Sequence, residues 1–66
     1  MKVKLSPQQA RALTLYGQGQ SLREISIALG VSYNRVLNII NEILAKTPFK
    51  NKQELLMHAQ NIEIDD

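Results

Sequence analysis

Between Ser21 and Leu44 the sequence contains two amphipathic stretches separated by one glycine. In the first stretch, apolar residues recur at helical spacing at Leu22, Ile25, Ala28 and Leu29. In the second, they recur at Val36, Ile39, Ile40, Ile43 and Leu44. Gly30 stands between the two, where a tight turn between helices needs a residue that tolerates a positive φ. This pattern is typical of a helix-turn-helix, and we expect the rest of the chain to support it.

Capping signals define where the helices begin. Ser6, Ser21, Ser32 and Asn51 are good N-caps, and a Gln or Glu stands three residues after Ser6, Ser21 and Asn51, as a capping box requires. Pro48 limits the third helix, because the residue before a proline resists helical geometry. The sequence therefore predicts helices over 7–16, 22–29, 33–46 and 52–60. No strand is expected, so the predicted fold class is all-α, a four-helix helix-turn-helix domain.

Length and composition favour one small domain over residues 1–66. A chain of 66 residues has room for a single compact core. Residues 1–5 are interpreted as a basic lead-in arm, and residues 61–66 as a frayed acidic tail.

Several functional classes find no support in the residues. The chain has no cysteine, which excludes disulfides and thiolate ligands and fits a reducing cytoplasm. His58 has no carboxylate or second histidine at ligand spacing, so we expect no metal, no cofactor and no enzymatic activity. No apolar run approaches the roughly 20 residues of a membrane span, so no membrane partner is expected.

Charge is distributed unevenly along the chain. Residues 1–52 contain all eight lysines and arginines but only two acidic residues, whereas residues 53–66 contain four acidic residues and no basic one. A basic body favours a polyanionic partner, because its cations neutralise phosphates and release counterions. The alternative is that the lysines serve only to keep the domain soluble.

The predicted third helix has an inward and an outward face. Its helical period places Val36, Ile39 or Ile40, Ile43 and Thr47 inward. The outward face then comprises Asn34, Leu37, Asn38, Asn41 and Ala45. Asparagine can bind adenine bidentately and leucine can contact a thymine methyl, so Asn34, Leu37, Asn38 and Asn41 are candidates to read A·T-rich DNA in the major groove. Alternatively, the three asparagines form an ordinary solvated face.

Groups around this face are candidates for holding phosphates. They lie at the starts of the second and third helices and at the end of the third, and comprise Ser21, Arg23, Ser32, Tyr33, Arg35 and Lys46. Such contacts would position the protein on DNA without reading its sequence.

Short motifs along the chain together resemble a known family. Leu5-Ser6-Pro7 is similar to an L-T-P opening, Gly19 with Ser21 and Glu24-Ile25 to G-x-S-x-x-E-I, and Leu29-Gly30-Val31-Ser32 to L-G-I-S. Val36, Ile43-Leu44 and Lys46 fit T-V-K-x-H-x-x-x-I-L-x-K, and Asn51-Lys52 with Glu54-Leu55 is similar to N-R-x-E-A. From Leu5 to about Ala59, the chain resembles the LuxR-type (GerE-like) helix-turn-helix domain of bacterial transcription regulators.

This resemblance implies a DNA-binding domain that commonly forms homodimers on inverted half-sites through its fourth helix. The residues that it assigns to the dimer contact are Leu56, Met57 and Gln60. RNA polymerase or another regulator is a further expected partner. When bound to DNA, such a cytoplasmic protein would be associated with the bacterial nucleoid.

The chain also departs from the family pattern. Where the family has threonine, lysine and histidine, this chain has Arg35, Leu37 and Ile39, which removes two usual polar contacts. Arg35-Val36 with Ile39 instead resembles the helix-turn-helix in the last region of sigma factors. An alternative function is therefore a LuxR-like anti-activator or adaptor that binds protein through an apolar face of the third helix, formed by Leu37, Ile39 and Ile40.

Overall fold

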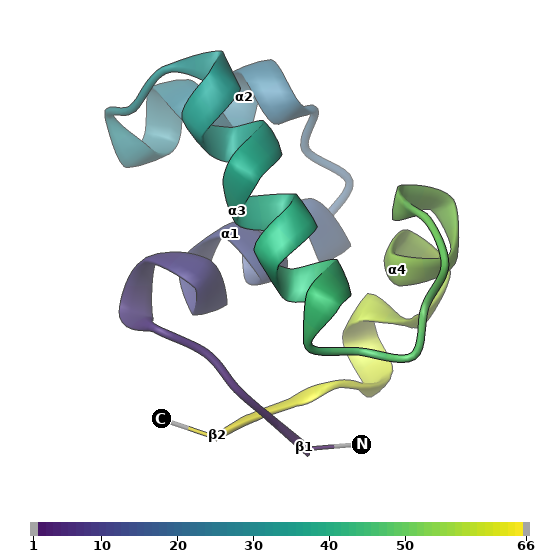
Figure 1. The fold of residues 1–66 in the computed structure, drawn as a ribbon. Helices are drawn as coiled ribbons and strands as arrows, with labels where there is room; N and C mark the ends of the chain where they lie inside the picture. Colours follow the sequence, from purple (N-terminus) through teal and green to yellow (C-terminus); the bar gives the residue numbers. More distant parts are fainter. Residues whose placement is uncertain (1, 66) are drawn as a thin grey trace.

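The computed structural model describes residues 2–65, and most of them are helical (Figure 1). Within this range the elements are β1 (Lys2–Lys4), α1 (Pro7–Gly17), α2 (Leu22–Leu29), α3 (Tyr33–Ala45), α4 (Lys52–His58), the 3-10 helix η1 (Ala59–Asn61) and β2 (Glu63–Asp65). The four predicted α-helices are therefore present. Met1 and Asp66, the outermost residues of the predicted arm and tail, lie outside the described residues.

The helices begin where the capping signals place them. The Ser6 Oγ accepts from the Gln9 amide at 3.2 Å, and the Gln9 Oε1 accepts from the Ser6 amide at 3.0 Å. Ser21 and Glu24 form the same reciprocal pair at the start of α2. At α4 the prediction of a capping box was half right. Asn51 caps the Glu54 amide, but the Glu54 carboxylate accepts from the Lys50 amide, so the box does not close on Asn51.

Three helix ends differ from the expected ends by one or two residues. α1 continues to Gly17, and α3 stops at Ala45 with Lys46 as its C-cap. α4 stops at His58, and the next three residues tighten into η1, a common ending for a helix. The turn after α2 is as predicted, because Gly30 has a left-handed φ of 70°.

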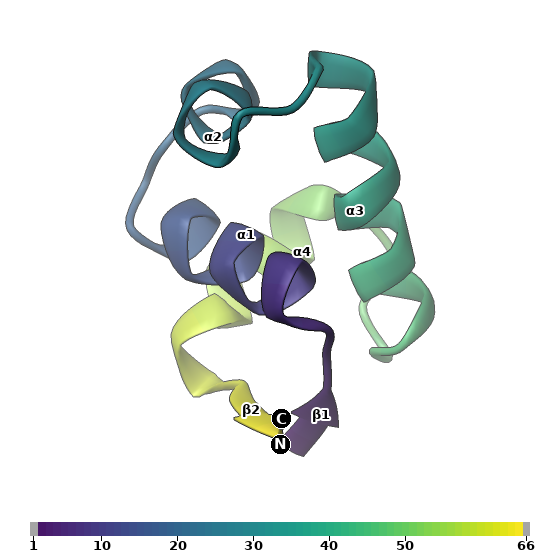
Figure 2. The same ribbon diagram turned by 90° about the vertical axis from the view of Figure 1, so that its left-hand side faces the viewer.

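Both ends of the described chain form strands, which corrects the all-α prediction. β1 and β2 pair in parallel, with Val3 opposite Ile64 and a lysine opposite an acidic residue on either side. Figure 2 shows the two strands together below the helices. The predicted frayed tail is wrong for residues 62–65, because Ile62 is buried and Ile64 is half-buried. Alternation of polar and apolar residues drives this pairing, since one face of the ribbon can then cover the helices.

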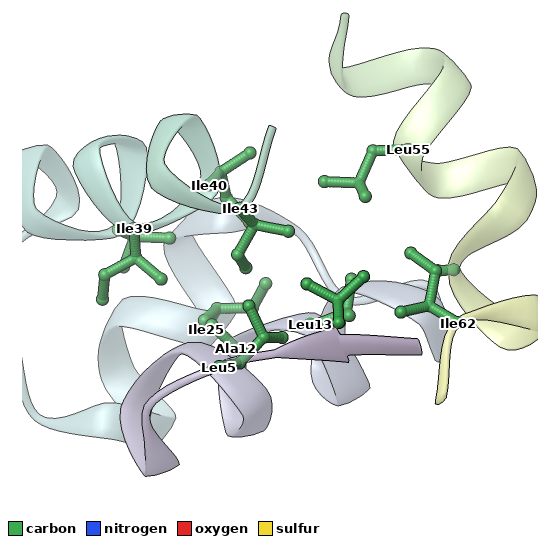
Figure 3. Close-up of a cluster of buried hydrophobic side chains, with 12 residues drawn as sticks. Leu5, Ala12, Leu13, Ile25, Ile39, Ile40, Ile43, Leu55 and Ile62 are labelled. Carbon is green, nitrogen blue, oxygen red and sulfur yellow. The ribbon is translucent and has the colours of Figure 1, made fainter. Parts of the chain in front are cut away.

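The core lies where the helices meet, and Figure 3 shows its side chains pointing toward one another. Its fully enclosed members include Leu13 of α1, Ile25 of α2, Val36, Ile39, Ile40 and Ile43 of α3, and Leu55 of α4. The apolar stripe predicted for α2 is wrong at Ala28, which is exposed. Ser26 is buried instead, and its hydroxyl donates to the Arg23 carbonyl at 2.6 Å, which satisfies the polar group inside the fold.

None of the described helices has both the length and the apolar character needed to cross a membrane. α3, the longest of them, has 13 residues.

Candidate nucleic-acid interface

α3 has a completely buried face and a mainly polar, exposed strip opposite it. Val36, Ile39, Ile40 and Ile43 are 0% exposed. Asn34, Asn38 and Asn41 are exposed, as the sequence predicted, and exposed Ala45 continues their strip toward the end of the helix. Leu37 is half-buried at the edge of this strip. Three of the four candidate base-reading side chains therefore project to solvent from one side of a rigid helix.

The position of α3 follows from its two neighbours. α3 packs against both α1 and α2, and the Gly30 turn joins it to α2 (Figures 1 and 2). Because four isoleucine and valine side chains are enclosed, α3 cannot rotate without exposing apolar surface. The orientation of the asparagine strip is therefore fixed by the core.

The side chains at the helix starts that are candidates to bind phosphates are exposed, and two of them also cap a helix. Ser21, Arg23, Ser32 and Tyr33 are all exposed. The Ser21 and Ser32 hydroxyl oxygens accept from the amides of Glu24 and Arg35 at 3.1 Å. Each serine can still donate its own O–H to an anion while it caps its helix.

The other two candidates, Arg35 and Lys46, lie on the flank of α3 that faces the start of α1. The Arg35 Nη2 donates to the Gln8 Oε1 at 3.0 Å, and its Nη1 lies 3.9 Å from the Glu42 Oε2. The Lys46 Nζ donates to the Gln9 Oε1 and to the Lys4 carbonyl, both at 3.2 Å. The structure thus engages within the fold two of the three cations that we expected on DNA phosphates, and the third, Arg23, is exposed.

We refer to Gln8, Gln9, Arg35, Glu42 and Lys46 as the α1–α3 seam. Within it, the Gln9 Nε2 donates to the Glu42 Oε1 at 3.1 Å. The sequence analysis did not identify either glutamine or Glu42 as part of the candidate site. The spacing of Arg35 and Glu42 does carry a signal, because seven residues are close to two helical turns and place both side chains on one flank. Nothing local indicates that α1 supplies the glutamines.

The capping box of α2 makes one part of this region sensitive to acid. Hydrogen bonds from the Ser21 backbone and side chain lower the pKa of Glu24 below its usual value of 4.5. A lowered folded-state pKa contributes stability above the unfolded pKa, and that contribution is lost as pH falls through the folded pKa. The stabilisation that the Glu24 carboxylate gives to the start of α2 should therefore be lost only below about pH 4.5.

Replacing Glu24 with glutamine should remove this acid-dependent contribution. Gln9 shows that glutamine fits the same position of a capping box, so the hydrogen bond itself can persist. At neutral pH the variant should be less stable, because a charged carboxylate at a helix start interacts better with the helix dipole. Urea denaturation at pH 7 and pH 3 should show the two proteins converging in acid. Glu63→Gln, outside any cap, is the control, and a constant difference between wild type and Glu24→Gln at both pH values would refute the prediction.

The residues assigned to a dimer contact lie together on α4 and η1. Met57 is 71% exposed and Leu56 is 42% exposed. Gln60 is exposed and lines a shallow hollow of about 280 Å³. Its other lining residues come from α1, η1 and the chain leading into β2: Leu13, Thr14, Gly17, Gln18, Ala59, Ile62 and Ile64.

His58 packs flat against Phe49, with ring centroids 5.0 Å apart. Among residues 2–65, no group of three or more histidine, cysteine or acidic side chains is arranged to hold a metal ion.

The apolar face proposed for the alternative, protein-binding function is not present on α3. Ile39 and Ile40 are 0% exposed, and Leu37 is half-buried. In place of an extended apolar patch, the solvent side of α3 carries asparagines.

Comparison with known proteins gives no further assignment: no protein-family model, curated protein or solved structure matches the chain.

Proposed function

We propose that this domain binds double-stranded DNA sequence-specifically as a bacterial transcription regulator or the DNA-binding part of one, with α3 in the major groove. The observation that carries the proposal is the asparagine strip of Asn34, Asn38 and Asn41, exposed on a helix whose opposite face is fully buried. Asparagine is a mediocre helix former, so three of them on one exposed face cost helix propensity that lysine or glutamate would have spared. The capacity of these asparagines to form hydrogen bonds with bases would explain their presence on this face.

The surroundings of the strip support this proposal. Arg23 and the start of α2 are exposed on a helix that packs against α3, and together with the exposed start of α3 they offer cationic and N–H groups to phosphates. Asparagine amides fit adenine N6 and N7, so the preferred half-sites are A·T-rich.

The LuxR-type resemblance extends the proposal to oligomeric state. In that arrangement two copies associate through α4, with exposed Leu56, Met57 and Gln60 at the contact, and bind inverted half-sites. RNA polymerase or another regulator is then a secondary partner of the bound dimer.

Titrating salt against binding to random duplex DNA tests the proposal directly. Binding to phosphates should weaken steeply as salt rises, with log K falling by about 0.9 for each phosphate neutralised. Fluorescence anisotropy of a labelled duplex at several salt concentrations gives this slope. Selection of bound duplexes from a random pool then gives the preferred sequence. Absence of binding at low salt would overturn the proposed function.

A further inference from the structure

The α1–α3 seam contains an acidic side chain beside the proposed DNA surface. Glu42 is exposed on α3, between Asn41 on the polar strip and the flank that carries Arg35 and Lys46. Its two carboxylate oxygens have different partners, since Oε1 accepts from Gln9 and Oε2 faces Arg35. Glu42 therefore occupies the position from which it can orient a cation and also repel a phosphate.

Building on the proposed function, we propose that Glu42 is a positioning residue that holds Arg35 in the α1–α3 seam and limits the affinity of α3 for DNA. In the free protein, Arg35 is directed toward Gln8 and Glu42. When DNA binds, a phosphate oxygen replaces Glu42 as the partner of the guanidinium. Arg35 thus contributes to DNA affinity only after it leaves the seam.

The geometry makes this exchange feasible. The Arg35–Glu42 pair is long, at 3.9 Å, and the two side chains are 44% and 46% exposed, so water already competes for both charges. Exposed ion pairs of this kind contribute little to stability. A phosphate, in contrast, accepts two parallel hydrogen bonds from a guanidinium, which is a stronger and more specific arrangement.

Lys46 differs from Arg35 in what restrains it. Its ammonium donates to Gln9 and to the backbone carbonyl of Lys4, and neither acceptor carries a net charge. Removing the negative charge of Glu42 therefore removes an ion pair from Arg35 but leaves both hydrogen bonds of Lys46 in place. The substitution Glu42→Gln keeps an amide oxygen that can accept from Gln9, so it removes the charge while preserving the hydrogen bond.

Glu42→Gln should bind random duplex DNA about three- to tenfold more tightly than the wild type at about 0.1 M salt, because Arg35 no longer has to leave an ion pair and Glu42 no longer repels phosphates. The slope of log K against log salt should stay the same, because under this exchange Arg35 neutralises the same phosphate in both complexes. Fluorescence anisotropy on one labelled duplex measures both quantities. The decisive readout is whether the gain in affinity depends on Arg35, since neither a purely structural role for Glu42 nor a simple change of net charge requires that residue.

Two further variants separate the release of Arg35 from the loss of one negative charge. Glu63→Gln makes the same change of charge on β2, away from α3, and should give a smaller gain and an unchanged slope. In an Arg35→Gln background, Glu42→Gln should gain no more than Glu63→Gln does. Circular dichroism melting of each variant shows that it is folded under the binding conditions.

The outcomes distinguish this inference from the proposed function. If the wild type binds duplex DNA but Glu42→Gln gains no more than Glu63→Gln, the role of Glu42 is overturned and the proposed function stands. If the gain survives in the Arg35→Gln background, the restraint on Arg35 is overturned in the same way. If neither the wild type nor any variant binds duplex DNA at low salt, both are overturned.

Discussion

A variant with alanine at Asn34, Asn38 and Asn41 should lose most of its preference between DNA sequences while it still binds random duplex DNA. Each bidentate contact from an asparagine to adenine discriminates by about 1–3 kcal/mol, which corresponds to a factor of about 5 to 150 at its base pair. The groups that we propose to hold phosphates remain in place, so the sequence-independent affinity and its salt dependence should change little.

The measurement for this variant is the ratio of two dissociation constants, for the selected duplex and for a scrambled duplex of equal length. The single change Asn38→Ala should relax selectivity at one base pair only. Gln53→Ala, which removes an exposed amide from α4, is the matched control and should leave the ratio unchanged. An unaltered ratio in the triple variant would show that the exposed strip of α3 is not the reading surface.

Replacing Ile39 with alanine should cost about 2–5 kcal/mol of unfolding free energy, because it deletes fully buried methyl groups and leaves a cavity. Ile39 is 0% exposed and is one of the core side chains drawn in Figure 3. A domain of this length is stable by roughly 3–10 kcal/mol, at about 0.05–0.15 kcal/mol per residue. The substitution should therefore remove a large fraction of the domain's unfolding free energy and lower its melting temperature.

The control for this substitution is the same change at Ile27, which is 75% exposed on α2. Ile27→Ala should alter stability by no more than about 0.5 kcal/mol, as is usual for surface substitutions. Urea denaturation followed by circular dichroism gives both values. Equal losses of unfolding free energy at the two positions would contradict the burial of Ile39. They would instead agree with the protein-binding alternative, which requires Ile39 on an exposed face.

Sequence reasoning succeeded where the deciding signal is local. A serine or asparagine followed three residues later by Glu or Gln identified the starts of α1, α2 and α4, because the capping bonds form within one turn. The period of apolar residues in α3 separated its buried side from its asparagine strip for the same reason. Gly30 marked the turn, since few other residues adopt a φ of 70° without strain.

Features that depend on distant parts of the chain were not predicted. β1 and β2 form only because each supplies the other with a hydrogen-bonding partner, although their alternating polar and apolar residues were a readable signal. The α1–α3 seam joins residues 27 to 37 positions apart, and no local pattern indicates which glutamine will meet which charge. The restraint on Arg35 and Lys46 was missed for this reason.

The pairing of the two strands also affects the order in which the domain folds. Lys2 and its partner Glu63 are 61 positions apart, so the ribbon closes a loop that includes nearly the whole chain. Closing so long a loop costs conformational entropy, and three residue pairs recover little of it. Contacts within and between neighbouring helices carry a much smaller cost, so they form first. We therefore expect β1 and β2 to pair last, on a helical core that is already assembled.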